Sequence, residues 1–313
     1  MRTSTSGARA AVAAMLLIAL GLSISACGGS DASADNEKVT LTIASASYPG
    51  EPIILGEIYS QALADAGYTV KKELGRVGET QAQKALLAGQ ISGYPLSPRV
   101  ALLYFFGIES GEVPTSEQKA YDLVKAELEK EGLTAFPPTP YVNAYAVGAL
   151  QKTAERLGLK NVSDLKGKAE GLTLSGAPEC PELANCLVGL EKGYGLKFKA
   201  FYPRFITSRY AVLNSGKADL SMLYTTDAQL SGQSKYIALE DDKHIFPAGN
   251  ATAFLTTQKV ADKAGPDFEK TIVDVQKGLT LSAIRKLNAK VELEGKNPEA
   301  VARQYLESGG YVG

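Results

Sequence analysis

The chain has 313 residues, of which 45% are hydrophobic and 21% charged, and its formal net charge is −1 at pH 7. This is the composition of an ordinary globular protein, with enough residues for a large core. Because positive and negative charges balance, nothing in the composition favours a nucleic acid or an acidic surface as partner, and we expect no nucleic-acid binding.

The chain begins with the features of a secretory signal. Arg2 and Arg9 accompany a short apolar run at 10–22, and small residues follow it. The run is too short to span a bilayer as a mature helix, so residues 1–26 are predicted to be a signal peptide.

The end of this signal predicts a lipid anchor. Residues 24–27, ISAC, resemble a bacterial lipobox, in which the cysteine becomes the acylated N-terminus. The resemblance implies that Cys27 is lipidated; the alternative is an ordinary signal peptide in which this cysteine is incidental. Residues 27–37 are small and polar and are expected to form a flexible tether. We therefore expect an extracytoplasmic protein, anchored to the cell membrane by its N-terminal lipid.

The next part of the chain alternates predicted strands and helices. Apolar residues alternate with polar ones in the strands and recur at helical spacing in the helices. The predicted order is strand 39–45, helix 52–67, strand 68–74, helix 80–89 and strand 90–96. This order predicts an α/β fold with a largely parallel sheet.

A second α/β series lies between two segments that cross from one half to the other. The predicted elements are a charged helix at 116–131, a crossing at 143–147, a strand at 171–176, a helix, glycine turn and strand at 209–227, a return crossing at 250–255, and helices at 266–287 and 297–308. The crossings predict two lobes, 38–143 with 251–313 and 144–250. Strand carboxyl ends then face a ligand cleft between the lobes.

Two cysteines lie close together in the second series. Cys180 and Cys186 are close enough in sequence to close a small disulfide loop, which an extracytoplasmic setting permits. A metal site is the alternative. The chain has a single histidine, His244, and no second cysteine cluster to complete such a site, so we expect neither a metal nor another cofactor.

The sequence has few features of an enzyme. His244 lies in a charged turn beside Asp241 and Asp242, where a surface position is more common than a general base. The acids at 240–242 could bind a hard cation, but consecutive acids in a turn are usually solvated. No nucleophile elbow, P-loop or dinucleotide fingerprint is present. We expect a binding protein, with a lipid-anchored hydrolase as the alternative from another class.

Five segments resemble, in order and spacing, the OpuAC-like substrate-binding proteins of ABC importers. They are SDLKGKAEGLTLSGAPECPE (163–182), GLEKGYGLKF (189–198), LNSGKADLSMLYTTDAQL (213–230), LEDDKHIFPAGNAT (239–252) and VELEGKNPEAVARQYLESGG (291–310). The resemblance extends from about Val39 to the C-terminus. It implies a two-lobe, type II periplasmic-binding fold and a monomer that delivers a small solute to the permease and ATPase subunits of its transporter.

The resemblance also implies a quaternary-amine osmoprotectant, such as glycine betaine, choline or carnitine. A quaternary ammonium donates no hydrogen bond, so a site recognises it through the faces of aromatic rings. The chain has 15 Tyr and no Trp, which is consistent with a cage of tyrosines.

Tyrosines at predicted strand ends, in loops or at crossings are the candidates for this cage, and a structural role is the alternative for each. They are Tyr48, Tyr94, Tyr141, Tyr145 and Tyr224. Thr226 and Asp227 match the family's TD motif, and Asn250 lies at the return crossing. Asp227 could instead cap a helix. Tyr94 and Tyr224 occupy equivalent places in the two lobes, so we expect them to face each other across the closed cleft.

The chain also departs from the family pattern. Members commonly read G-x-I-D-x-Y-P-E-Y-T-G-T where this chain has GQISGYPLSPRV at 89–100, so Ser92 replaces an acid and Arg99 introduces a cation near the cleft. Pro52 stands where a Gln is common, and Ala248 stands where some members have an aromatic residue. These departures make a non-betaine solute, whether anionic, sugar-like or aromatic, the alternative ligand.

Overall fold

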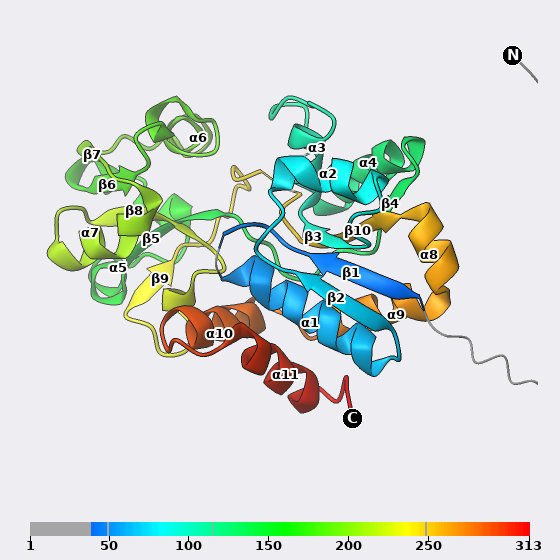
Figure 1. The fold of residues 1–313 in the computed structure, drawn as a ribbon. Coiled ribbons are helices and arrows are strands. Elements are labelled where there is room, and N and C mark those ends of the chain that lie inside the picture. Colours follow the sequence, from blue (N-terminus) through cyan, green and yellow to red (C-terminus); the bar gives the residue numbers. More distant parts are fainter. Residues whose placement is uncertain (1–38, 49, 115, 248) are drawn as a thin grey trace, which may run out of the picture. The chain divides into compact units, whose positions relative to one another are not determined.

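The computed structural model describes residues 39–313, except positions 49, 115 and 248 (Figure 1). The predicted signal peptide, Cys27, the tether and Ala248 therefore lie outside the described residues. Contacts group residues 37–313 as one unit. In the part of the chain that the structure describes, every helix is too short or too polar to cross a membrane.

Strands from the beginning and the end of the chain combine in what we call the first lobe. They are β1 (Thr40–Ala44), β2 (Thr69–Glu73), β3 (Tyr94–Leu96), β4 (Leu133–Ala135) and β10 (Ala253–Thr257). β1 and β2 pair in parallel, and β10 lies between β3 and β4, antiparallel to both. A parallel bridge between Ile43 and Gly93 connects β1 to the segment before β3. The first lobe is therefore mixed and less parallel than predicted.

The helices of the first lobe include the last four helices of the chain. They are α1 (Glu51–Asp65), α2 (Glu79–Leu87), α3 (Pro98–Tyr104), α4 (Glu117–Lys130), α8 (Gln258–Ala264), α9 (Pro266–Gln276), α10 (Leu281–Glu292) and α11 (Pro298–Ser308). The single helix predicted at 266–287 is wrong. The chain turns between α9 and α10, and the side chain of Thr280 accepts a hydrogen bond from Ala283 N to begin the second helix.

The second lobe contains a five-stranded sheet in the order β7-β6-β8-β5-β9. Its strands are β5 (Tyr145–Leu150), β6 (Thr173–Gly176), β7 (Ala200–Pro203), β8 (Leu220–Tyr224) and β9 (Tyr236–Ala238). β6 pairs in parallel with β7 and β8, while β5 is antiparallel to β8 and β9. The helices α5 (Gln151–Leu157), α6 (Leu187–Tyr194) and α7 (Arg209–Ser215) accompany this sheet (Figure 1).

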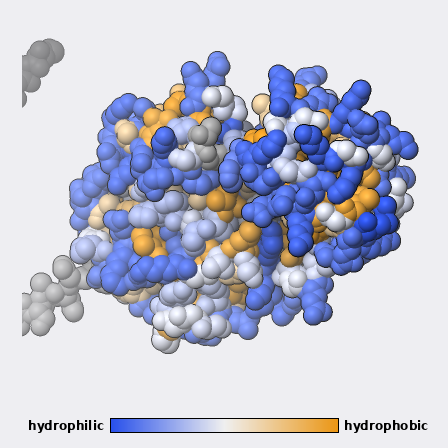
Figure 2. All heavy atoms as spheres, turned by 180° about the vertical axis from the view of Figure 1, so that it is seen from behind, coloured by the Kyte–Doolittle hydropathy of each residue, from blue (hydrophilic) through white to orange (hydrophobic). Residues whose placement is uncertain are grey.

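The buried apolar residues form separate cores on the two sides of the crossings. Two clusters draw on residues 39–141 and 253–312, and two others draw on residues 145–246. The crossings lie side by side, since Val142 forms an antiparallel bridge with Ala251 and Asn143 N donates to Asn250 O at 3.3 Å. On the face shown in Figure 2, hydrophilic residues predominate and apolar residues appear in several separate places. The lobe boundaries stay a prediction.

The predicted disulfide between Cys180 and Cys186 is present in the structure. The two Cα atoms are 5.2 Å apart. Both cysteines are buried in a core cluster of the second lobe, directly before α6. Among the described residues, no group of three or more His, Cys, Asp or Glu side chains could hold a metal ion. The disulfide is therefore part of the second-lobe core.

Candidate functional site: a cleft between the lobes

A cavity of about 490 Å³ lies where the carboxyl ends of several strands meet the first residues of α1 and α2. Both lobes and both crossings contribute to its lining: Ala46, Tyr48, Glu51, Pro52, Leu55, Glu79, Pro95, Leu96, Ser97, Val100, Asn143, Arg209, Tyr224, Thr226, Asp227, Asn250, Thr252, Asn288 and Glu292. A volume of this size suits a small solute. We call this cavity the cleft.

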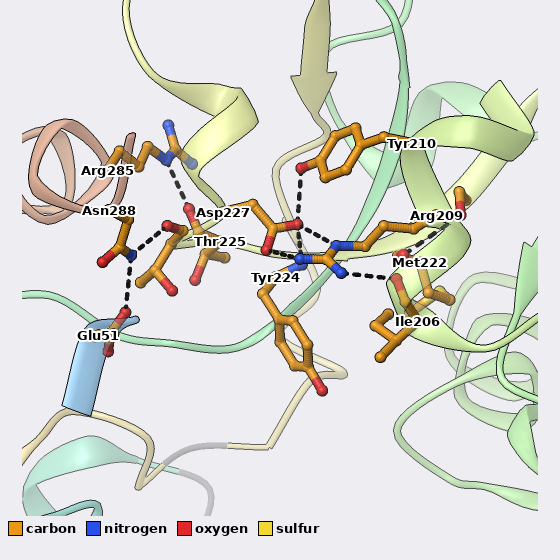
Figure 3. A network of polar contacts seen from close by, with 12 residues as sticks. Glu51, Ile206, Arg209, Tyr210, Met222, Tyr224, Thr225, Asp227, Arg285 and Asn288 are labelled. Atoms are coloured by element: carbon orange, nitrogen blue, oxygen red, sulfur yellow. Dashed lines mark hydrogen bonds and ion pairs between the residues drawn. The ribbon is translucent and has the colours of Figure 1, made fainter. Parts of the chain in front are cut away.

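A buried ion pair forms the second-lobe side of the cleft (Figure 3). Asp227 Oδ1 accepts from Arg209 Nη2 at 2.6 Å, and Asp227 Oδ2 accepts from Arg209 Nε at 2.7 Å. Tyr210 OH donates to the same carboxylate at 2.7 Å, and Tyr224 N donates at 3.1 Å. The two charged side chains are 17% and 5% exposed. This bidentate geometry is the strong form of such a pair.

Three of the five N–H donors of Arg209 are used. Arg209 Nη1 donates to Ile206 O at 2.7 Å, so every nitrogen of the guanidinium has an acceptor. Asp227 precedes a short 3-10 turn at Ala228–Leu230, but its carboxylate makes no capping bond there. Asp227 therefore occupies the N-cap position of this turn, as the alternative role predicts, but its side chain does not cap the turn. Its carboxylate instead fixes Arg209 and the end of β8.

Helix α10 ties the first lobe to the segment after β8. Arg285 Nε donates to Thr225 O at 2.6 Å, and Asn288 Nδ2 donates to Thr226 O at 2.9 Å. The same Asn288 nitrogen lies 3.3 Å from Glu51 Oε2, its second acceptor (Figure 3). One face of α10 thus binds the backbone carbonyls of Thr225 and Thr226. Through Asn288 it also contacts Glu51 of α1 at the floor of the cleft.

Glu51 is the first residue of α1 and contributes a carboxylate to the floor of the cleft. Tyr141 OH donates to its Oε1 at 3.0 Å. Burial raises the pKa of Glu51, while hydrogen bonds, from Thr226 first, act in the opposite direction. A carboxylate at the N-terminus of a helix also offsets the positive end of the helix dipole.

Two further carboxylates line the cleft without a cation to pair with. Glu79 is the first residue of α2 and accepts from Tyr48 OH at 3.2 Å; burial raises the pKa of this carboxyl. Glu292 is the last residue of α10, and burial followed by the charge of Asp227 raises its pKa. Among the described lining residues, four are acidic and Arg209 alone is basic. The lining therefore has an excess of acidic over basic side chains.

Residues 39–308 match the family OpuAC, described as the substrate binding domain of ABC-type glycine betaine transport system. The chain belongs to this family. The glycine-betaine-binding protein of Pseudomonas aeruginosa is 30% identical over 293 residues, which cover 90% of this chain and 91% of that protein. OpuAC proteins are extracytoplasmic substrate-binding components of ABC transporters, so the family resemblance and the substrate-binding role expected from the sequence are confirmed.

Other relatives of this OpuAC protein differ in length. The ergothioneine transport permease/ergothioneine binding protein EgtU of Helicobacter pylori is 26% identical over 264 residues. These cover 82% of the present chain but only 45% of EgtU, so the chain spans less than half the length of that relative. A crystal structure titled glycine betaine/carnitine/choline ABC transporter has a TM-score of 0.78 at 24% identity, covering 87% of this chain and 99% of the other. The predicted two-lobe, type II periplasmic-binding fold is confirmed.

The structure brings together some of the predicted site residues in the cleft of this OpuAC protein. Those that line the cleft are Tyr48, Tyr224, Thr226, Asp227 and Asn250. Tyr48 is 52% exposed, and the ring of Tyr224 extends away from the Asp227 carboxylate (Figure 3). These two are the aromatic side chains in the lining, among the residues that the structure describes.

The other predicted tyrosines lie outside the lining. Tyr94 is 0% exposed in a first-lobe core, and its OH donates to Val77 O at 2.9 Å. It therefore does not share the cleft with Tyr224 in this structure. Tyr141 is buried, and its OH donates a hydrogen bond to the Glu51 carboxylate. Tyr145 stacks on Tyr224 with ring centroids 5.0 Å apart, so it positions that ring.

Several lining residues were not predicted from the sequence. The polar ones are Glu51, Glu79, Ser97, Asn143, Arg209, Thr252, Asn288 and Glu292. The acids at the starts of α1 and α2 each follow a predicted strand and loop, a place where a ligand is common in open α/β sheets. This position is the sequence feature that could have identified Glu51 and Glu79 as lining residues. Nothing in the local sequence distinguishes Asn288 and Glu292 from surface residues of an amphipathic helix.

Charged residues that suggested other ligands have structural partners instead. Arg99 is 7% exposed and donates to Ser110 Oγ; it lies between the lining residues Ser97 and Val100 but is not itself in the lining. Asp241 accepts from Tyr194 OH at 2.5 Å and from Phe246 N at 2.8 Å. Asp242 accepts from Ser163 N at 3.2 Å. These acids hold their turn to the rest of the second lobe.

The affinity of the cleft for a cationic solute is expected to increase as pH rises above the ordinary glutamate pKa of about 4.3. Because the pKa values of Glu51, Glu79 and Glu292 are raised in the free folded protein, these three groups bind more protons there than in the unfolded chain, and their contribution to stability falls as pH rises through this window. A bound cation favours the ionised carboxylates, so binding releases protons. Calorimetry at about pH 5 and about pH 7.5, in buffers of different ionisation enthalpy, measures both effects. Equal affinity at both values, or proton uptake, would contradict this expectation.

Proposed function

We propose that the chain is the solute-binding component of an ABC importer and captures a small solute with a quaternary ammonium head for delivery to a permease. The observation that carries the proposal is the cleft, in which two tyrosine rings and an excess of carboxylates come together. A quaternary ammonium offers no N–H donor, so ring faces and opposite charge are the interactions open to it.

The names of the relatives support the same head group. Glycine betaine, carnitine and ergothioneine, which occur in these names, all contain a trimethylammonium group. Each of the three also carries a carboxylate, and they differ in the part of the molecule between these two groups. A trimethylammonium head is thus one of the two charged groups that these solutes share.

The two rings alone would give modest affinity. A cation–π contact contributes about 0.5–2 kcal/mol, depending on desolvation. The carboxylates of Glu79 and Glu292 add opposite charge to a site from which a bound solute excludes water, where electrostatic attraction is stronger than in bulk solvent. We propose that rings and carboxylates act together in place of the larger tyrosine cage expected from the sequence.

An enzyme has less support. His244 does not line the cleft and adopts a positive φ of 53° in the turn that Asp241 holds. Among the described lining residues there is no His, Cys or Lys, the side chains that most often serve as a general base or activated nucleophile. We therefore propose a binding protein that acts as a monomer and performs no chemistry on its solute.

A thermal-shift screen tests the proposed function. The panel contains glycine betaine, choline, carnitine and ergothioneine beside amino acids, sugars, polyamines and aromatic acids. We expect at least one quaternary amine to raise the melting temperature at concentrations well above its dissociation constant, because a ligand that binds only the folded state stabilises it. If an anionic or uncharged solute raises the melting temperature and no quaternary amine does, the proposed solute class is wrong.

Replacing Tyr224 by Ala is expected to weaken binding of the quaternary amine about five- to thirtyfold, through loss of about 1–2 kcal/mol of cation–π energy. The ring lines the cleft and has no partner that depends on its hydroxyl apart from Tyr145, at 3.5 Å. Titration calorimetry measures the loss. Tyr104→Ala is the control, because Tyr104 is 57% exposed and outside the cleft. Equal solute affinities of the wild type and Tyr224→Ala would show that this ring does not contact the solute.

We further propose that Cys27 carries the lipid that holds the protein at the membrane, since residues 24–27 have the pattern of a lipobox. Cys27→Ser is expected to release the protein from the membrane fraction of the producing cells, because acylation needs the thiol. Cell fractionation, with mass spectrometry of the mature N-terminus, checks this. An unmodified Cys27, or cleavage at another position, would show an ordinary signal peptide instead.

A further inference from the structure

We infer that a second cavity, on the opposite side of the crossings from the cleft, binds a small monocarboxylate with an apolar body. The volume of this cavity is about 550 Å³. Helices α4 and α10 of the first lobe and strands β5 and β9 of the second contribute to its lining. Among the described residues, none lines both this cavity and the cleft. We call it the rear cavity.

Adjacent residues of the chain separate the two cavities. Asn143 and Thr226 line the cleft. Their neighbours line the rear cavity: Val142, Ala144 and Thr225. Thr225 Oγ1 donates to Val142 O at 2.7 Å and accepts from Ala144 N at 3.0 Å, which fixes this segment against the first crossing. The rear cavity is therefore a distinct site and not an extension of the cleft.

Arg285 on α10 lines the rear cavity and keeps most of its hydrogen-bonding capacity unused. Its Nε donates to Thr225 O at 2.6 Å (Figure 3). Nη1 and Nη2 have no acceptor or ion-pair partner among the described residues, so four of the five N–H donors remain. The side chain is partly buried, and burial lowers the pKa of Arg285. An anion bound to the guanidinium would stabilise its charged form.

The acids of the rear cavity limit the charge of its ligand. Glu117, Glu240 and Asp241 line it, against two basic residues, Lys160 and Arg285. Both oxygens of Glu117 accept from backbone N–H groups, at 3.4 Å and 3.1 Å, and both oxygens of Asp241 have the donors described above. Glu240 and Lys160 are exposed. This balance suits one negative charge at Arg285 and disfavours a multiply charged anion such as phosphate.

Much of the remaining lining is apolar. The larger apolar side chains and the alanine beside them are Val142, Ala146, Leu239, Phe246 and Leu281. Apolar walls with a small number of polar groups are typical of cavities that bind small molecules. A carboxylate accepts two parallel N–H bonds from a guanidinium, and an apolar body would cover the walls. The ligand class is therefore a small organic monocarboxylate with an aromatic or branched aliphatic body.

Methyl NMR of the mature chain, titrated with benzoate and without any cleft solute, tests this site. We expect saturable shifts of the methyl groups of Val142, Leu239 and Leu281, with a dissociation constant of about 1 mM or tighter. Benzyl alcohol, which lacks the carboxylate, should bind at least about tenfold more weakly, and inorganic phosphate should cause no saturable shift. Shifts confined to cleft methyl groups such as those of Leu55 and Leu96, or no saturable shift, would overturn the inference. Equal binding of benzyl alcohol or phosphate would also contradict it.

Two neighbouring residues of α10 provide a matched pair of variants. Arg285→Gln and Lys286→Gln each remove one positive charge, but Lys286 is exposed and lines neither cavity. We expect Arg285→Gln to weaken benzoate binding at least about tenfold and Lys286→Gln to leave it unchanged. Arg285→Lys keeps the charge and a donor for Thr225 O, so it guards against a loss of folding; its binding should still be weaker, because an ammonium lacks the guanidinium fork. Wild-type affinity in both Arg285 variants would show that Arg285 does not hold the carboxylate.

Discussion

Asp227→Ala is expected to lower the free energy of unfolding by about 3–5 kcal/mol, because removal of one partner leaves the buried charge of the other uncompensated. Arg209 is only 17% exposed, and in this variant its guanidinium would keep Ile206 O as its one remaining acceptor. The variant also takes an acceptor from Tyr210 OH and Tyr224 N at the end of β8. Urea unfolding measures the change.

A surface ion pair provides the control for this experiment. Arg303 Nε lies 2.7 Å from Glu307 Oε1, and the two side chains are 39% and 55% exposed. Glu307→Ala is expected to change the unfolding free energy by less than about 1 kcal/mol, as exposed pairs do. If Asp227→Ala were as mild as Glu307→Ala, the ion pair would not be the structural centre of the second-lobe side of the cleft.

Tyr94→Ala is expected to lower the free energy of unfolding by about 3–5 kcal/mol, the usual cost of truncating a buried aromatic residue. The ring is 0% exposed and packs in a first-lobe core, and the substitution also leaves Val77 O without its donor. Thermal and urea unfolding measure the loss. Because Tyr94 does not line the cleft, the affinity of the folded protein should change much less than in Tyr224→Ala.

This comparison separates two tyrosines that look alike in the sequence. Tyr94→Phe should keep most of the stability, since it preserves the packed ring and removes only one hydrogen bond, worth about 1 kcal/mol. A large loss of solute affinity in Tyr94→Phe would show that the Tyr94 hydroxyl contributes to the site, and would contradict its position in the first-lobe core.

The difference between Tyr94 and Tyr224 shows where sequence reasoning reaches its limit. Each tyrosine follows a helix and a glycine turn, and the sequence predicts a short strand at each place, but Tyr94 is the first residue of its strand, β3. The periodicity of a strand indicates which residues alternate, but all three residues of β3 are buried, so alternation does not show that Pro95 and Leu96 line the cleft while Tyr94 packs in the core. Tyr224 is the last residue of β8, where the sheet ends and the cleft begins. Only the packing around each strand distinguishes the two.

Strand ends and crossings were predictable because local patterns determine them. Thr226, Asp227 and Asn250 line the cleft, where strand carboxyl ends converge in such folds, and their contact with the solute stays a prediction. The role of Asp227 was not predictable, because its partner Arg209 is 18 residues earlier and meets it only through the pairing of α7 with β8. The position of Glu292 in the cleft was not predictable either, because it depends on the direction that α10 takes after its N-cap, Thr280.

The cleft's recognition of a positive charge is tested most directly by a solute and its uncharged twin. Choline and 3,3-dimethyl-1-butanol have nearly the same shape, and differ in that a carbon replaces the charged nitrogen. In competition calorimetry against the tightest solute of the screen, we expect the uncharged twin to bind at least about thirtyfold more weakly, since it loses both the cation–π contacts and the attraction of the carboxylates. Equal competition by the two molecules would show that the cleft recognises shape alone, and would contradict the function proposed for it.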